Sequence, residues 1–307
     1  MGDLVRYGTI LKDAGTGKIV AHVQETGLAG KALSTLGGGP FGPVSSISSI
    51  VANVQLVKIQ GMLAFMQALQ FATLGAAVAG IGVSAAGFAS LNKKVAAVGE
   101  SIQDFRAAVE IEFERLAKAR IRDMLASLHG HLSVAEQNFL SGAGNDEWQR
   151  VGRQFIEASE PFRLELEHEL DQNVLDATLL HTLIGAWCLS NNSATRAFLL
   201  ADDLRGAEVH ARTVSEKYDS AFDELSPVRL AQLLNEPHHS ERQSASSIID
   251  SQNKAQEMVD FVREVQETAA AAPFLIETLH ARRLSGREYV LAAENEERAP
   301  LVLLPNA

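Results

Sequence analysis

The chain holds one candidate set of metal ligands, at residues 129–136. His129 and His131 flank Gly130, and Glu136 follows within two helical turns. Imidazole nitrogens and a carboxylate are ligands that zinc accepts. Two solvated histidines near a helix end are the more common reason for such a pattern, so we expect no metal site here. No other pattern in the chain calls for a cofactor, and none is expected.

A second cluster of ionisable groups could supply an acid and a base for catalysis. It consists of Glu165, Glu167, His168, Glu169 and Asp171. A charge run of this kind is usually the solvated face of a helix. The sequence also lacks HExxH, GxSxG and paired CxxC motifs, which carry common hydrolase and zinc chemistries. We therefore expect no catalytic residues and no enzyme activity.

Two further polar segments have weaker chemical readings. DAGTGK, residues 13–18, is similar to a phosphate-binding loop, but Ile19 replaces the required Ser or Thr and the first glycine is missing. His238 and His239 follow Pro237 in a polar stretch, where titration near neutral pH could bias an interface. Chance accounts for this pair equally well, so neither segment is assigned a role.

The composition is that of a globular protein. The 307 residues are 46% hydrophobic and 21% charged, with a net charge of −11 that is concentrated after residue 60. An acidic body argues against nucleic acid as a partner, because phosphate binding needs clustered Lys and Arg. The single cysteine, Cys188, lies in an apolar run and suits a reducing compartment. No signal peptide is visible at the start of the sequence, so we expect the protein to be made in the cytoplasm and to start there.

The pattern predicts a mainly α-helical chain with four regions. Residues 1–36 contain a β-hairpin, with strands over 4–12 and 18–24 joined by DAGTG. Two strands alone are marginally stable, so LVLL at 301–304 is a candidate third strand. Residues 37–46 form a Gly and Pro hinge, residues 47–128 a long helical hairpin, and residues 129–307 an acidic helical bundle.

Inside the bundle region, apolar residues recur at helical spacing over 133–171, 173–190, 194–224, 227–235 and 244–285. Prolines at 161, 227, 237 and 273 punctuate these segments. Residues 177–190 are uniformly apolar but too short to span a bilayer, so they predict a central core helix. Trp148, Trp187 and Cys188 are expected to be buried packing residues.

The most unusual feature is the uncharged run Phe71–Leu91, in which no side chain is more polar than Ser or Thr. About 20 apolar residues in a helix cross a bilayer. The run contains seven Ala and four Gly among its residues, so its transfer into lipid is weaker than that of a Leu-rich anchor. Small residues recur four apart and favour close helix association. The segment either spans, reverses as a hairpin at residues 80–82, or stays buried in the protein.

This run gives the residues that we expect to act. The expected membrane-inserting side chains are Phe71, Leu74, Val78, Ile81, Val83, Phe88 and Leu91. The expected helix-association and hinge residues are Gly75, Gly80, Gly82, Gly87, Gly37, Gly38, Gly39, Pro40 and Pro43.

Residues 45–128 resemble α-helical pore-forming proteins of the cytolysin type, in which a long helical hairpin carries an uncharged tip. The resemblance is architectural and rests on the uncharged run, its small-residue spacing and the amphipathic helices on either side. It implies a toxin or defence effector that is cytoplasmic when soluble and membrane-associated when active. Its implied partners are a lipid membrane, other copies of the chain and a regulatory protein of unknown identity.

Two other readings of the same run stay open. A hydrophobic helix can be wrapped on all sides inside a soluble helical scaffold. It can also be a single-pass anchor, with Lys93 and Lys94 holding the bundle on the cytoplasmic side.

Overall fold

The computed structural model describes residues 4–7, 10–25, 112–171, 177–223, 225–226, 228–230, 245–295 and 301–305. The described part is mainly α-helical, as predicted, whereas residues 47–111 of the expected long helical hairpin lie outside the described residues. Its helices are α4 (Glu112–Ser141), α5 (Asn145–Leu170), α6 (Ala177–Leu200), α7 (Leu204–Phe222), α9 (Ala245–Ala281) and α10 (Gly286–Asn295).

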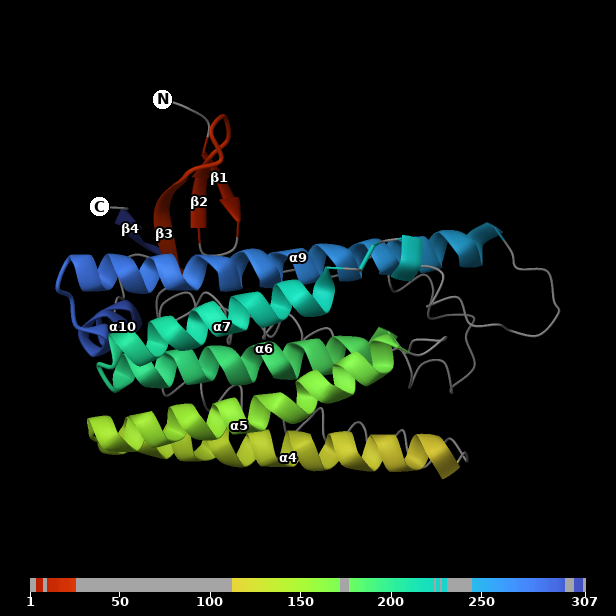
Figure 1. Ribbon diagram of the computed structural model, residues 1–307, viewed down its shortest axis with the longest axis horizontal. Coiled ribbons are helices and arrows are strands. Elements are labelled where there is room, and N and C mark those ends of the chain that lie inside the picture. The colour runs from red at the N-terminus through yellow and green to blue at the C-terminus, as the bar shows by residue number, and fades with distance from the viewer. Residues whose placement is uncertain are drawn as a thin grey trace.

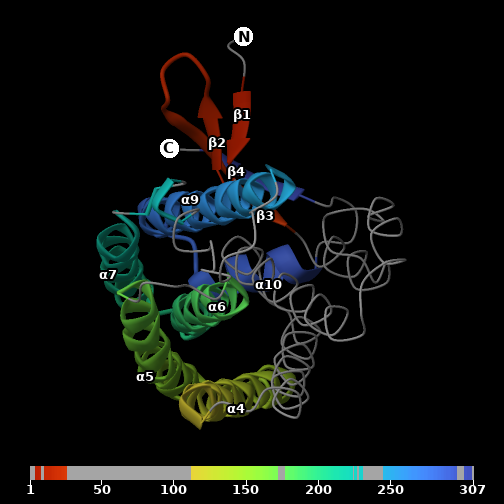
Figure 2. The same ribbon diagram turned by 90° about the vertical axis from the view of Figure 1, so that its right-hand side faces the viewer.

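The long helices are stacked with their axes roughly aligned, in the spatial order α9, α7, α6, α5 and α4 (Figure 1). Viewed from one end, α9, α7, α5 and α4 form an arc around α6 (Figure 2). Helix α5 packs against α4 and α6, and α7 packs against α6 and α9, as in other helical bundles. The central position of α6 agrees with its composition, since it is the most apolar of these helices.

Helix α6 confirms the predicted core helix and extends it. Every residue from Leu180 to Asn191 is buried, and Trp187 and Cys188 are each only 1% exposed. The predicted end at residue 190 is wrong, because the helix continues to Leu200. Ser190 donates a hydrogen bond to the Ala186 carbonyl oxygen, four residues earlier, so the gap between the predicted segments 173–190 and 194–224 is helical.

Three helices end in the same way. In α4, Ala143 N–H donates to Asn138 O and Gly142 N–H to Phe139 O, which is the hydrogen-bond pattern of a Schellman motif. The same pair of bonds closes α6 and α9. The residue at the left-handed position is Gly142 in α4, but Asp202 (φ 57°) in α6 and Arg283 (φ 55°) in α9.

The ends of several helices differ from the predicted ones. The helix that we expected to end near Leu128 runs on as α4 to Ser141, and the break lies at residues 142–144 instead. Pro161 and Pro273 lie inside α5 and α9 rather than between helices. A proline removes one backbone donor, so the Glu157 carbonyl lacks its usual partner four residues on. Packing of the long amphipathic helices outweighs that local cost.

The terminal strands form one antiparallel sheet. Its members are β1 (Leu4–Tyr7), β2 (Ile10–Asp13), β3 (Ile19–Glu25) and β4 (Leu301–Pro305), in the order β1-β2-β3-β4. The predicted hairpin and its third strand from the C-terminal end are confirmed, since β4 pairs with β3. The stretch predicted as one strand over 4–12 forms the two paired strands β1 and β2. The sheet stands on the side of α9 that faces away from α6 (Figures 1 and 2).

The β2–β3 turn is fixed by one side chain. The Asp13 carboxylate accepts hydrogen bonds from the backbone N–H of Gly15 at 3.0 Å and of Thr16 at 2.8 Å. These bonds, with that from the Thr16 hydroxyl, hold the pKa of Asp13 below its usual value. Asp13 therefore binds its own turn, and the DAGTGK segment forms a hairpin loop.

Candidate functional site

The predicted membrane-inserting and hinge residues all lie within residues 26–111, outside the described residues. The His238 and His239 pair also lies outside them. Within the part of the chain that the structure describes, no helix is both long and apolar enough to cross a bilayer.

The acidic residues near the end of α5 differ in burial and in their partners. The Glu165 side chain is 3% exposed and pairs with Arg120 of α4 at 2.6 Å, whereas Glu167 is exposed and pairs with Arg163 on its own helix. Asp171 is exposed and caps the end of α5 with its backbone N–H. The expected solvated face is therefore wrong for Glu165, whose carboxylate is a buried link between α4 and α5.

The two histidines of the candidate metal set lie in the middle of α4. His131 packs edge-on against the ring of Phe155 of α5, with ring centroids 6.2 Å apart. Burial lowers the pKa of His131, and the nearby Glu157 opposes that effect. No group of three metal-ligating side chains occurs among the described residues.

A groove of about 660 Å³ lies between α4 and α5, and His131 and Glu157 are among the residues that line it. Its lining residues are Arg120, Asp123, Met124, Ser127, His131, Glu157, Ala158 and Pro161. The groove has charges of both signs. Arg120 pairs with Glu165 and Asp123 pairs with its neighbour Arg122 at 3.1 Å, so both of these charges are already compensated within the protein.

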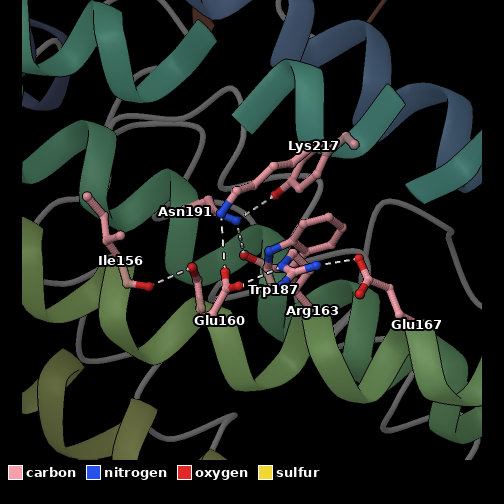
Figure 3. A network of polar contacts seen from close by, with 9 residues as sticks. Ile156, Glu160, Arg163, Glu167, Trp187, Asn191 and Lys217 are labelled. Carbon is pink, nitrogen blue, oxygen red and sulfur yellow. Dashed lines mark hydrogen bonds and ion pairs between the residues drawn. The ribbon is translucent and has the colours of Figure 1, made fainter. Parts of the chain in front are cut away.

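A surface network joins α5 to α7 (Figure 3). Glu160 of α5 accepts a hydrogen bond from Arg163 Nε at 2.8 Å and another from Lys217 Nζ of α7 at 3.2 Å. The bond from Arg163 is the main cause that lowers the pKa of Glu160; partial burial opposes it and Lys217 supports it. Glu160 therefore links Arg163 on its own helix to Lys217 on α7.

A buried polar cluster joins α6 to α7. The Asn191 side chain donates to the Trp187 carbonyl at 3.0 Å and to the Tyr218 hydroxyl at 3.3 Å (Figure 3). His210 Nε2 lies 3.2 Å from the Asn191 carbonyl oxygen. Burial lowers the pKa of His210 to about 4, so the imidazole is neutral at physiological pH. Burial also raises the pKa of Tyr218 well above its usual value.

Another polar cluster, which we call the end junction, consists of Ala143, Leu200, Asp202, Gly286 and Arg287. Arg287 of α10 donates from Nε to the Leu200 carbonyl at 2.7 Å and from Nη2 to the Ala143 carbonyl at 2.8 Å. Gly286 N–H donates to the Asp202 carboxylate at 2.8 Å. The first turn of α10 thus binds both the end of α6 and the α4–α5 turn.

Sequence reasoning assigned no role to Asn191, His210 or Arg287. For α6 a signal was present, because His181, Asn191 and Arg196 interrupt an otherwise apolar helix and all three are buried. A polar residue inside an apolar helical run is the pattern that predicts such a buried link. Arg287 carried no comparable signal, since its partners are backbone carbonyls of segments far away in sequence.

Comparison with known proteins adds no assignment. The chain matches no protein-family model, no curated protein sequence and no solved structure. Each of the polar clusters joins helices of the bundle through ion pairs or hydrogen bonds.

Proposed function

We propose that this protein is a membrane-inserting helical effector that acts as an oligomer, of the pore-forming or membrane-disrupting kind. The observation that carries the proposal is the uncharged run Phe71–Leu91 in a chain with a net charge of −11. Such a run has the length of a spanning helix, while its many small residues make insertion conditional.

The described bundle supports a protein that changes conformation. Its core contains ionisable side chains that are costly to bury, among them Glu165, His181 and Arg196. A core built only of hydrophobic residues of similar volume is often more stable than one that contains buried ionic groups. We infer that the bundle holds the effector in its soluble state and opens before insertion.

Oligomerisation follows from the geometry of a pore. One helix cannot enclose an aqueous channel, whereas several copies of the same helix can. The small residues at 72, 76, 80 and 84 repeat every four positions, which lets helices approach closely in a membrane. We expect the active form to lie at the membrane and the inactive form to lie in the cytoplasm.

Dye release from liposomes tests the proposal. The wild type should release dye under a suitable trigger such as acidification, and Val83→Lys should abolish release because a charge in the bilayer centre is unfavourable. Val209→Lys is the matched control, since Val209 is 60% exposed on α7 and should tolerate the same change. No leakage from the wild type under any trigger, in a folded preparation, would refute the proposal.

A soluble scaffold is the alternative that one observation favours. Helix α6 demonstrates that this chain can wrap an apolar helix inside its own bundle. If the run 71–91 is wrapped in the same way, Val83→Lys should unfold the protein instead of only blocking leakage. Fractionation of the wild type with and without detergent, with circular dichroism of the variant, separates the two functions.

A further inference from the structure

We propose that the first turn of α10 is a latch that keeps the α4–α5 turn and the end of α6 together, and that its release frees α4. This inference rests on the proposed function, because α4 is the first described helix after the expected inserting segment. The latch consists of Gly286 and Arg287, and it closes the end junction.

The α6 side of the latch follows from how that helix ends. The Schellman bonds and the last helical bond occupy the carbonyls of Ala197, Phe198 and Leu199. The Leu200 carbonyl is the next acceptor, and Arg287 Nε donates to it at 2.7 Å. Leu200 is 2% exposed, so this carbonyl would be left without a donor in an apolar setting if Arg287 moved away.

The α4 side of the latch uses the same guanidinium. Its Nη2 donates to Ala143 O at 2.8 Å, and Ala143 is the residue that closes the Schellman motif of α4. Arginine can make both bonds together because its planar group carries donors in a fixed fork. One side chain of α10 therefore connects the α4–α5 turn to the end of α6.

Backbone contact makes the latch tight. A Cβ atom placed on Gly286 would lie 2.9 Å from the Leu199 carbonyl oxygen and 3.0 Å from Leu204. A side chain at this position would push α10 away from α6. Gly286 N–H also donates to Asp202, the left-handed residue of the α6 ending, so the contact holds α10 by its backbone as well as by Arg287.

The latch is also connected to the chain termini. Strand β4 follows α10 in sequence and pairs with β3 over five register positions, from Ala21 with Pro305 to Glu25 with Leu301.

Hydrogen exchange of the full-length protein tests the latch without a membrane. Arg287→Gln and Gly286→Ala should each accelerate exchange of the Gly142 and Ala143 amides at least tenfold, because both loosen α10 by different means. Arg205→Gln is the control, because Arg205 is exposed on the first turn of α7. The substitution removes the same charge and should leave exchange of the two amides unchanged. Unchanged exchange in both latch variants would overturn the proposal.

Dye release from the same variants separates the latch from the proposed function. If both hold, the two latch variants release dye at a severalfold lower protein concentration than the wild type and Arg205→Gln. Faster exchange with no release from any protein upholds the latch and refutes membrane disruption. Wild-type release that is unaltered in both latch variants refutes the latch and leaves the proposed function standing. A variant that loses its helical circular dichroism is replaced by Arg287→Lys, which retains a donor and should show a smaller acceleration.

Discussion

His210 Nε2 of α7 lies 3.2 Å from the carbonyl oxygen of Asn191 of α6, in the interior of the bundle. A carbonyl can only accept, so Nε2 carries the proton of the neutral imidazole. The ring of Phe198 lies beside His210 at 6.0 Å, and the charge of Lys217 further disfavours a second proton. The imidazolium keeps this Nε2–H donor, so the bond to Asn191 opposes the lowering of the His210 pKa, and burial is the larger effect.

Acid should destabilise the bundle through its buried histidines. The pKa of His210 and that of His181 are each about 4 in the folded protein because of burial, against 6.5 for the free side chain. Below pH 6.5 the unfolded state binds more protons than the folded state. The contribution of these histidines to the free energy of unfolding is therefore fully present above that pH and is lost as the pH drops to about 4. We expect each histidine to contribute a loss of about 3 kcal/mol, at ~1.4 kcal/mol per pKa unit.

Urea unfolding at pH 7 and pH 4.5 measures this loss. His210→Gln keeps a donor for the Asn191 carbonyl but does not titrate. The difference between the free energies of unfolding at the two pH values should therefore shrink by about 2 kcal/mol. His280→Gln removes an exposed histidine and should leave the difference as in the wild type. A pH difference that is the same in His210→Gln and the wild type would contradict the assignment.

The pair between Arg120 and Glu165 should respond unequally to loss of its two members. The Glu165 side chain is 3% exposed and that of Arg120 is 61% exposed. Arg120→Gln leaves a buried carboxylate without its cation and should lower the free energy of unfolding by about 1–3 kcal/mol. Glu165→Gln leaves only an exposed cation and should cost less.

Denaturant titration of both variants tests this order. Arg150→Gln is a suitable control, since its contact with Glu147 is 4.0 Å long and both side chains are exposed. If Glu165→Gln proved the more destabilising of the two, the ion pair would not be the dominant interaction of that carboxylate.

Arg283→Gly should stabilise the protein. Arg283 has φ 55° at the end of α9, a conformation that costs a non-glycine residue roughly 1–2 kcal/mol. Glycine loses more freedom on folding, by about 0.5–1 kcal/mol, so a net gain of about 0.5–1 kcal/mol is expected. Thermal unfolding should then shift upward by a few degrees, and a lower melting temperature would contradict the role of backbone strain.

Closure of the termini can be trapped by a disulfide. Val23 of β3 and Leu303 of β4 are direct partners in the antiparallel register. Directly opposed Cα atoms lie about 4.5–5.5 Å apart, within the range that a disulfide spans. Cysteines at both positions should cross-link under mild oxidation, as detected by mass spectrometry. The Val23→Cys, Val302→Cys pair, displaced by one residue, should cross-link poorly, and the reverse preference would disprove the register.

The sequence predicted the parts of this fold that depend on periodicity and composition. The core helix around Trp187 and the pairing of LVLL with the N-terminal hairpin follow from apolar runs and from the instability of an isolated hairpin. These features are local, or require only one long-range partner, and the pattern of side chains is sufficient to indicate them.

Helix ends and polar contacts were less predictable. Pro161 and the Ser190–Asn191 run indicate breaks by local rules, but tertiary packing carries α5 and α6 through both places. The position of Glu165 beside Arg120 depends on how α4 and α5 meet, which spacing within one helix does not determine. The contacts of Arg287 were equally unpredictable, because it binds backbone carbonyl groups, which every sequence contains.

Cys188 gives the chain a built-in chemical reporter. It is the single thiol of the sequence, it is 1% exposed in α6, and burial raises its pKa to about 12. The reactive thiolate is therefore both inaccessible and scarce while the helices stay together. A maleimide or disulfide reagent will label this position at a rate set by how often the interior admits it. Each modified molecule thus records one excursion from the closed form, without any engineered probe.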